Sequence, residues 1–363
     1  MTVKSYFSSD YNEAREKFIN VCCASSVEVE SHQNPSMGPD GEKLYTDVAL
    51  LGRREANEVL ILCSGTHGVE GLCGSGIQTG LVCEGLVSRL KEDQRVVVIH
   101  SINPYGFAHL RRTNEDNVDL NRNFVDHSTS HRNNHNYDVL ASAIAPETYW
   151  HIASGSSLFR LWLYQLTRGK AALQAAISSG QYEHPQGLFY GGKFEVWSNQ
   201  TLQAIVKRHV PNATQVAFVD FHTGLGPYGY GEIITNSLPG SPAFDRAAAW
   251  WGERVKTTKD GGAASADLDG SVKSALSEFL PKAQVTAVSL EFGTHPALTV
   301  FRAMQAENWL HHHGGLGHYR AAKIKARMRR VFYPGEKDWK VQVWQQANEV
   351  IDKALAGLSR IGR

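Results

Sequence analysis

The chain has 363 residues, of which 42% are hydrophobic and 20% are charged, and its formal net charge is +1. This composition is typical of a folded globular protein, and the nearly neutral charge argues against a nucleic-acid-binding surface as its main function. No stretch approaches the ~18 consecutive apolar residues of a membrane span, and the charged N-terminal stretch lacks the apolar run of a secretory signal. We therefore expect a cytoplasmic protein without nucleic-acid or membrane partners.

The cysteines are too few and too scattered to hold a metal or a disulfide framework. Five are present, none of them in a CxxC pair, whereas histidines number sixteen. A zinc site built on thiolates needs closely spaced cysteine pairs. Any metal site must therefore use histidines and carboxylates.

Helical and strand-like apolar patterns alternate along the chain, which predicts an α/β protein. The predicted helices are residues 11–22, 76–90, 157–178, 243–255, 301–311, 319–330 and 338–358. The predicted strands are residues 44–51, 59–63, 96–102, 216–221 and 285–292. Residues 96–99 are continuously apolar, which indicates a strand buried on both faces.

No linker rich in Gly, Pro or Ser divides the chain, so we expect a single domain over residues 1–363. Residues 126–199 open with a stretch rich in Asn, His and Ser and then contain a long helical pattern, and we interpret them as an insertion. The residues from about 300 to 363 are mostly helical in pattern and are predicted to form a C-terminal extension.

Residues that can bind a metal follow three of the predicted strands. His67 and Glu70 come after strand 59–63, three residues apart, a spacing that lets both side chains face one point. His222 follows strand 216–221, and Glu291 stands in the last predicted strand. Open α/β sheets hold their sites at the carboxyl ends of the strands. We therefore expect these four side chains to meet there.

Basic and polar residues follow the strand at residues 96–102. The segment that begins at Arg112 continues into Asp119-Leu-Asn121-Arg122-Asn-Phe. Charged groups that emerge from buried strands are costly unless they are paired or bind a ligand. Two guanidinium groups and an amide are thus predicted to join the site, with Arg111 as an alternative to Arg112.

The ordered motifs THGVEG, DLNRNF, DFHTG and LEFG resemble those of the zinc carboxypeptidase superfamily. Its carboxypeptidase A-like fold is shared by deacylases of the aspartoacylase and succinylglutamate desuccinylase type. The resemblance covers residues from about 59 to 293. It implies a three-layer sandwich in which helices flank a central mixed, mostly parallel sheet.

The same resemblance implies a role for each matching residue. His67, Glu70 and His222 would bind one zinc ion and leave a fourth position for water. Glu291 would be the general base, and Arg112 would stabilise the oxyanion. Asn121 and Arg122 would hold a substrate carboxylate, and Asp119 would accept the free ring N–H of His67.

One feature of the carboxypeptidases is missing from the sequence. They carry a mobile tyrosine somewhat before the catalytic glutamate, whereas no tyrosine occurs here from Gly231 to Glu291. Tyr228 and Tyr230 are candidates to replace it in substrate binding, as is Tyr190, although each also suits aromatic packing or a loop.

The predicted function is that of a zinc hydrolase that cleaves an amide bond next to a substrate carboxylate, as a metallocarboxypeptidase does with small peptides. One alternative is a deacylase of N-acyl amino acids, and another is a non-catalytic zinc-binding protein on the same fold. The oligomeric state has no signature in the sequence.

Three further motifs are interpreted as structural. The GxGxxG match at residues 224–229 contains Pro227 and runs into a strand-like segment, whereas a dinucleotide-binding loop opens directly into a helix. The three consecutive histidines at residues 311–313 would point in different directions on a helix. His135 and Asp138 stand at a loop-to-helix junction, where helix capping is the expected role.

Overall fold

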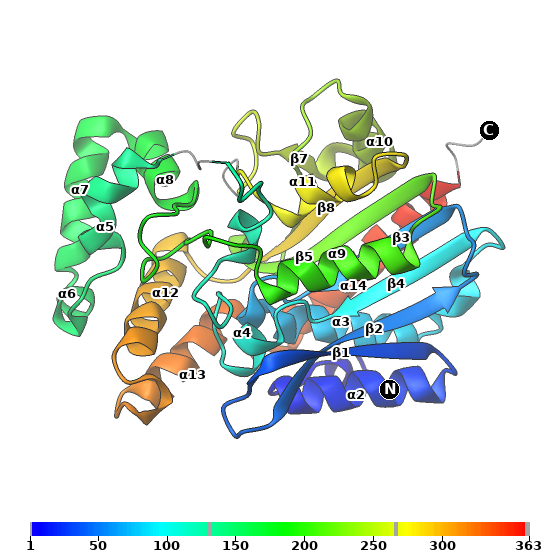
Figure 1. Ribbon diagram of the computed structural model, residues 1–363, viewed down its shortest axis with the longest axis horizontal. Helices are drawn as coiled ribbons and strands as arrows, with labels where there is room; N and C mark the ends of the chain where they lie inside the picture. Colours follow the sequence, from blue (N-terminus) through cyan, green and yellow to red (C-terminus); the bar gives the residue numbers. More distant parts are fainter. Residues whose placement is uncertain (1, 130–132, 265–267, 360–363) are drawn as a thin grey trace.

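A mixed sheet of eight strands runs through the structure, a computed structural model that describes residues 2–129, 133–264 and 268–359 (Figure 1). The strands lie in the order β1-β2-β4-β3-β5-β8-β6-β7. They are β1 (Glu28–Met37), β2 (Lys43–Gly52), β3 (Glu58–Ser64), β4 (Gln94–His100), β5 (Gln215–Tyr228), β6 (Gly231–Thr235), β7 (Val255–Thr257) and β8 (Gln284–Gly293).

The central strands β4, β3, β5 and β8 are parallel to one another. The strands β2 and β6 join the two sides of this group antiparallel, β1 is antiparallel to β2, and β7 is parallel to β6. The five strands predicted from the sequence are confirmed as β2, β3, β4, β5 and β8. Because four neighbouring strands are parallel, their carboxyl ends lie together at one edge of the sheet.

Helices cover both faces of the sheet, as the three-layer prediction requires. Leu60 and Leu62 of β3 pack into one hydrophobic cluster, whereas Ile61 and Cys63 pack into another on the opposite face. Helices of the first layer are α1 (Val3–Tyr6), α2 (Tyr11–Ala24), α3 (Gly71–Cys83), α4 (Pro104–Ala108), α10 (Pro242–Trp251) and α14 (Lys337–Leu358). Those of the second are α9 (Trp197–His209) and α11 (Val272–Phe279).

A group of six helices lies beside the sheet, and five of them share a third hydrophobic cluster, whereas Ile152 of the sixth helix, α6, belongs to a fourth cluster. The members α5 to α8 of this group appear as the green helices at the left of Figure 1, and α12 and α13 lie next to them. They are α5 (His135–Ile144), α6 (Tyr149–Ser154), α7 (Ser156–Arg168), α8 (Lys170–Ser178), α12 (Ala297–His312) and α13 (Ala321–Phe332). Four of them fall within residues 126–199, whose status as an insertion stays a prediction.

The structure corrects two predicted helices at glycines. The helix expected over residues 157–178 is two helices, α7 and α8, because Gly169 between them has a φ of +87°. The helix expected over residues 76–90 starts at Gly71 and ends at Cys83, shortly before Gly85, whose φ is +75°. Strand β1 and helices α9 and α11 are additions to the predicted elements.

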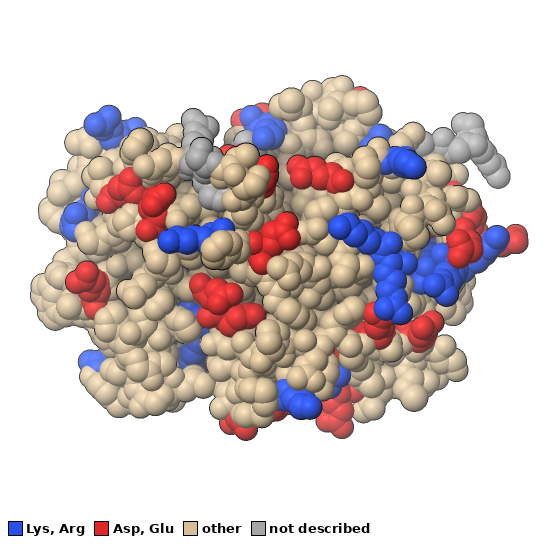
Figure 2. Space-filling model, in the orientation of Figure 1, with Lys and Arg blue, Asp and Glu red and all other residues tan. Residues whose placement is uncertain are grey.

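Charged side chains are spread over the surface. On the face shown in Figure 2, basic groups stand beside acidic ones instead of forming one basic surface. Among the described residues, no helix combines the length and the apolar character that a membrane span requires. The C-terminal helices predicted from about residue 300 are α12, α13 and α14, and the last four residues of that stretch lie outside the described part of the chain.

Candidate metal centre

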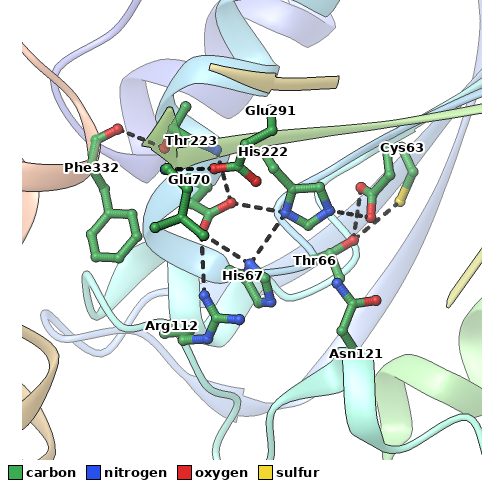
Figure 3. A network of polar contacts seen from close by, with 12 residues as sticks. Cys63, Thr66, His67, Glu70, Arg112, Asn121, His222, Thr223, Glu291 and Phe332 are labelled. Atoms are coloured by element: carbon green, nitrogen blue, oxygen red, sulfur yellow. Dashed lines mark hydrogen bonds and ion pairs between the residues drawn. The ribbon is translucent and has the colours of Figure 1, made fainter. Parts of the chain in front are cut away.

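Two histidines and a glutamate meet where β3 ends beside the middle of β5 (Figure 3). His67 precedes a single 3₁₀ turn, Gly68–Glu70, and this turn brings Glu70 back toward it. The Nδ1 atom of His67 lies 2.9 Å from Oε1 of Glu70 and 3.2 Å from Nδ1 of His222. The Nδ1 atom of His222 lies 3.0 Å from Oε2 of Glu70. The structure thus brings the three predicted ligands together.

The donor atoms fit a tetrahedral cation. Around zinc, bonds of about 2.0–2.1 Å place neighbouring ligand atoms about 3.3 Å apart. The three side chains are buried, and one potential ligand atom from each lies within 4.8 Å of the others. Two histidines with one carboxylate are a known donor set for a catalytic zinc that keeps one position open. The arrangement can therefore hold a metal ion of this kind.

Asp220 fixes the orientation of the His222 ring. The Nε2 atom of His222 donates to Oδ2 of Asp220 at 2.7 Å, and Thr66 donates its hydroxyl to the other carboxylate oxygen at 2.9 Å. A proton held on Nε2 leaves the lone pair of Nδ1 free for a metal. Burial lowers the pKa of His222, but Asp220 and Glu70 outweigh it and raise the pKa to about 10. The local field therefore favours a positive charge at this point.

Replacing Asp220 by asparagine is expected to weaken metal binding about tenfold to hundredfold, the usual cost of losing a hydrogen-bond partner of a ligating histidine. An amide cannot fix the proton on Nε2 as the carboxylate does, so Nδ1 becomes a poorer ligand. Competition with a chelator measures the metal affinity. Asp245→Asn, on the exposed side of α10, is the control. Equal affinities of D220N and the unsubstituted protein would contradict the role of Asp220.

Asp119 lies beside His67, as predicted, but its closest partners are two arginines. Its Oδ1 atom is 3.4 Å from Nε2 of His67, while Oδ2 accepts hydrogen bonds of 2.9 Å from both Arg112 and Arg122. Burial raises the pKa of Asp119, but the two guanidinium groups hold it well below its usual value. Asp119 is therefore a buried anion that ties a candidate ligand to both arginines.

The two adjacent arginines have different surroundings. Arg112 lines the cavity at the metal centre, and its Nη1 atom lies 3.6 Å from Oε1 of Glu70. Arg111 is fully buried and donates to Glu307 of α12 at 3.0 Å and to Asn117 at 2.8 Å. Arg112 is thus the arginine that faces the site, and Arg111 anchors the loop to α12.

Glu291 lies next to His222 in the sheet, because β5 and β8 pair these two residues in register. It lines the same cavity, and one of its carboxylate oxygens accepts the backbone N–H of Leu225 at 2.9 Å. Burial and the nearby carboxylate of Glu70 raise the pKa of Glu291 to about 7. A carboxyl group that titrates near neutral pH can both accept and return a proton.

Asn121 and Arg122 also line the cavity. The side-chain oxygen of Asn121 accepts the backbone N–H of Val272, which leaves its NH₂ group directed elsewhere. Arg122 donates to Asp119 and, at 2.6 Å, to the carbonyl oxygen of Ser178. Its Nε atom is buried without a hydrogen-bond partner among the described residues. Both residues thus stand where a ligand carboxylate can meet an amide or a guanidinium.

The tyrosine candidates lie away from this site. Tyr228 and Tyr230 are 46% and 40% exposed at the turn between β5 and β6, and neither lines the cavity. The hydroxyl of Tyr228 donates to Glu336 at 3.2 Å. Tyr190 is buried in the hydrophobic cluster that lies between the sheet and the helices α9 and α11. The structure therefore does not bring the predicted substrate-binding tyrosines to the metal centre.

The motifs interpreted as structural do not join the site either. Residues 224–228 continue strand β5, and β6 follows after a turn, so no helix opens from the GxGxxG match. His135 is exposed at the start of α5, and Asp138 pairs with His184 at 2.9 Å. The histidines at residues 311–313 stand at the C-terminal end of α12.

Sequence reasoning left Asp220 and Thr66 without a role, although both belong to the quoted motifs. Asp220 stands two residues before His222 on one strand, so their side chains share a face of the sheet. That spacing is the signal by which the partner of the ligating histidine could have been found. The hydrogen bond from Thr66 to Asp220 crosses between strand ends and has no such signal.

The chain is similar to several solved structures at low sequence identity. Thrombin activatable fibrinolysis inhibitor superposes with a TM-score of 0.50 at 11% identity, over 97% of this chain and 74% of that chain. For carboxypeptidase A from Helicoverpa armigera the TM-score is 0.45 at 14% identity, over 90% and 75% of the two chains. An aspartoacylase family protein from Mesorhizobium loti gives 0.38 at 16%, over 78% and 66%.

The likeness to thrombin activatable fibrinolysis inhibitor concerns the fold alone, and it agrees with the predicted α/β fold. No curated protein matches the sequence. A family of proteins, described as "Protein of unknown function (DUF2817)", matches residues 7–346. Because this match spans nearly the whole sequence, the chain belongs to that family.

Proposed function

We propose that the protein is a zinc-dependent hydrolase that cleaves an amide bond next to a substrate carboxylate. The observation that carries this proposal is the placement of Glu291 and Arg112 on the same cavity as His67, Glu70 and His222. A site that only stores or senses a metal needs neither a buried carboxyl group that titrates near neutrality nor a guanidinium beside the ligands. This argues against the alternative of a non-catalytic zinc-binding protein.

The three ligands would hold one zinc ion, which supplies Lewis-acid polarisation and activation of water when bound. Glu291 accepts the proton of the attacking water and then returns it to the leaving amine. Burial raises the pKa of Glu291, which makes its carboxylate a better proton acceptor. Arg112 donates hydrogen bonds to the negative charge that develops on the carbonyl oxygen.

Asn121 and Arg122 bind the substrate carboxylate. Arg122 lines the cavity, and its guanidinium is held in place by its hydrogen bonds to Asp119 and to the carbonyl oxygen of Ser178. The candidate substrates are small peptides and N-acyl amino acids, which both place a carboxylate close to an amide.

Metal analysis of the purified protein, followed by a substrate screen, tests the proposal. We expect one zinc per chain after dialysis against zinc-containing buffer, and hydrolysis of some members of a panel of dipeptides and N-acyl amino acids. Release of free amine is the readout. A chain that binds no stoichiometric metal, or a metal-loaded chain that hydrolyses no member of the panel, would contradict the proposal.

A further inference from the structure

The cavity at the metal centre continues between three helices of the third hydrophobic cluster. Its volume is about 750 Å³. Six of the apolar side chains that line this part come from α7, α8 and α12: Leu161, Trp162, Leu173, Ile177, Phe301 and Met304. All of them except Trp162 belong to the hydrophobic cluster or pack against it, so the wall is held in place by the core. We call these six side chains the apolar wall.

Three of the polar residues that these helices contribute lie at the outside of this part of the cavity. Gln165 of α7 and Lys170 and Gln174 of α8 line the cavity too, but they are exposed, whereas Leu161 is buried and Leu173 and Ile177 are half-buried. Apart from the indole N–H of Trp162, a residue that is 49% exposed, the six side chains of the apolar wall offer no hydrogen-bond partner. A peptide placed there would bury backbone amides without partners, which is unfavourable.

The size of the cavity also exceeds what one side chain requires. Volumes of about 300–1,000 Å³ accommodate ligands of drug size, so a single apolar residue of a peptide fills only part of this one. A hydrocarbon chain can cover the apolar wall without burying any polar group. Full burial of each methylene strengthens binding about fourfold.

From the apolar wall we propose that the substrate is an N-acyl amino acid with a long, unbranched acyl chain. The chain lies against the apolar wall, the amide lies at the metal ligands, and the carboxylate meets Asn121 and Arg122. This rests on the proposed function, which it narrows to the deacylase branch. Water is added across the amide bond, so that the products are a fatty acid and an amino acid whose amine takes up the proton.

The exposed apolar side chains of α7 are consistent with an amphiphilic ligand. Three apolar side chains of α7 that do not line the cavity are exposed: Phe159 (58%), Leu163 (43%) and Leu166 (62%). Trp162, which lines the cavity, is 49% exposed. A surface helix normally directs its apolar residues to one side only. On α7, apolar side chains occur both on the cavity wall and on the exposed side.

Binding to the Glu291→Gln variant tests the chain-length preference without turnover. N-acetyl-, N-octanoyl- and N-tetradecanoylglycine are titrated calorimetrically below their micelle concentrations. We expect Kd to fall about twofold to fourfold per added methylene until the chain fills the cavity. Dissociation constants that do not depend on chain length, or tighter binding of the dipeptide Phe-Gly than of N-tetradecanoylglycine, would overturn the proposal.

The proposed function is tested separately, by hydrolysis with the unsubstituted protein. Hydrolysis of dipeptides, or of N-acylglycines at rates that do not depend on acyl-chain length, would support the amide hydrolase and contradict the long-chain substrate. Chain-length-dependent binding without any hydrolysis would do the reverse, because the apolar wall would then bind chains at a site with no amidase activity.

A pair of tryptophans provides matched variants. Trp162→Ala removes a wall residue and is expected to weaken binding of N-tetradecanoylglycine about tenfold, with less than about a twofold effect on N-acetylglycine. Trp150 is 65% exposed on α6 and does not line the cavity, so Trp150→Ala should change neither value. Ile177→Asp, which places a charge on the wall, should abolish the advantage of the long chain. If all three variants bound N-tetradecanoylglycine with the same dissociation constant, the proposed role of the apolar wall would be wrong.

Discussion

Replacing Glu291 by glutamine is expected to lower kcat about a hundredfold to ten-thousandfold, the usual contribution of a positioned general base. The amide has the shape of the carboxyl group but cannot accept the proton of the attacking water. Zinc should remain bound at one ion per chain, because Glu291 is not among the three side chains whose donor atoms converge. Hydrolysis of the best substrate and metal analysis of the same sample measure the two quantities.

The matched control is Glu232→Gln. Glu232 lies directly across from Glu291 in the antiparallel pair of β6 and β8, but it does not line the cavity. This variant should keep full activity, which separates the loss of the base from the loss of a charge in the sheet. Undiminished turnover of E291Q, or loss of its zinc, would refute the assigned role.

Replacement of a metal-binding side chain should reduce zinc binding, unlike replacement of Glu291. The free energy of zinc binding at structural sites is about 10–16 kcal/mol, which is about 3 kcal/mol for each of about four ligands. His67→Ala is therefore expected to weaken zinc binding by about 3 kcal/mol, or at least about a hundredfold. Activity should fall with zinc occupancy. Because a ligand that binds only the folded state raises its stability, zinc should raise the Tm of the unsubstituted protein and barely change that of H67A.

His184→Ala is the control for this experiment, since His184 pairs with Asp138 and does not line the cavity. It should bind zinc as tightly as the unsubstituted protein. If H67A kept full zinc occupancy at the same chelator concentration, the metal would have to lie elsewhere, and the assignment of His67, Glu70 and His222 would fail.

The strands that carry the site were readable from the sequence because they are buried on both faces. Residues 96–99 and 216–219 are continuous apolar runs, and the second run is followed by Asp220 and His222 of the candidate metal centre. Strand β1 was missed for the opposite reason. It is an edge strand, mostly exposed or half-buried, and its sequence EVESHQNPSM contains Pro35 and no apolar run.

Some distinctions between neighbouring residues depend on tertiary contacts. The sequence favours Arg112 and leaves Arg111 as an alternative, and only the position of α12 shows that Glu307 pairs with Arg111. Similarly, the sequence places Tyr228 close to His222, but the long strand β5 carries it past the cavity to an exposed turn. Both distinctions depend on contacts between segments far apart in the chain.

Asp119 couples parts of the site that would otherwise be independent. This one carboxylate is shared by Arg112 and Arg122 and lies close to His67, so the group proposed for the oxyanion, the group proposed for the substrate carboxylate and a metal ligand have a common neighbour. Substitutions of residues in one such network have non-additive effects on free energy. Redesign of the head-group preference through Arg122 would therefore also alter metal affinity, and the two properties would have to be optimised together.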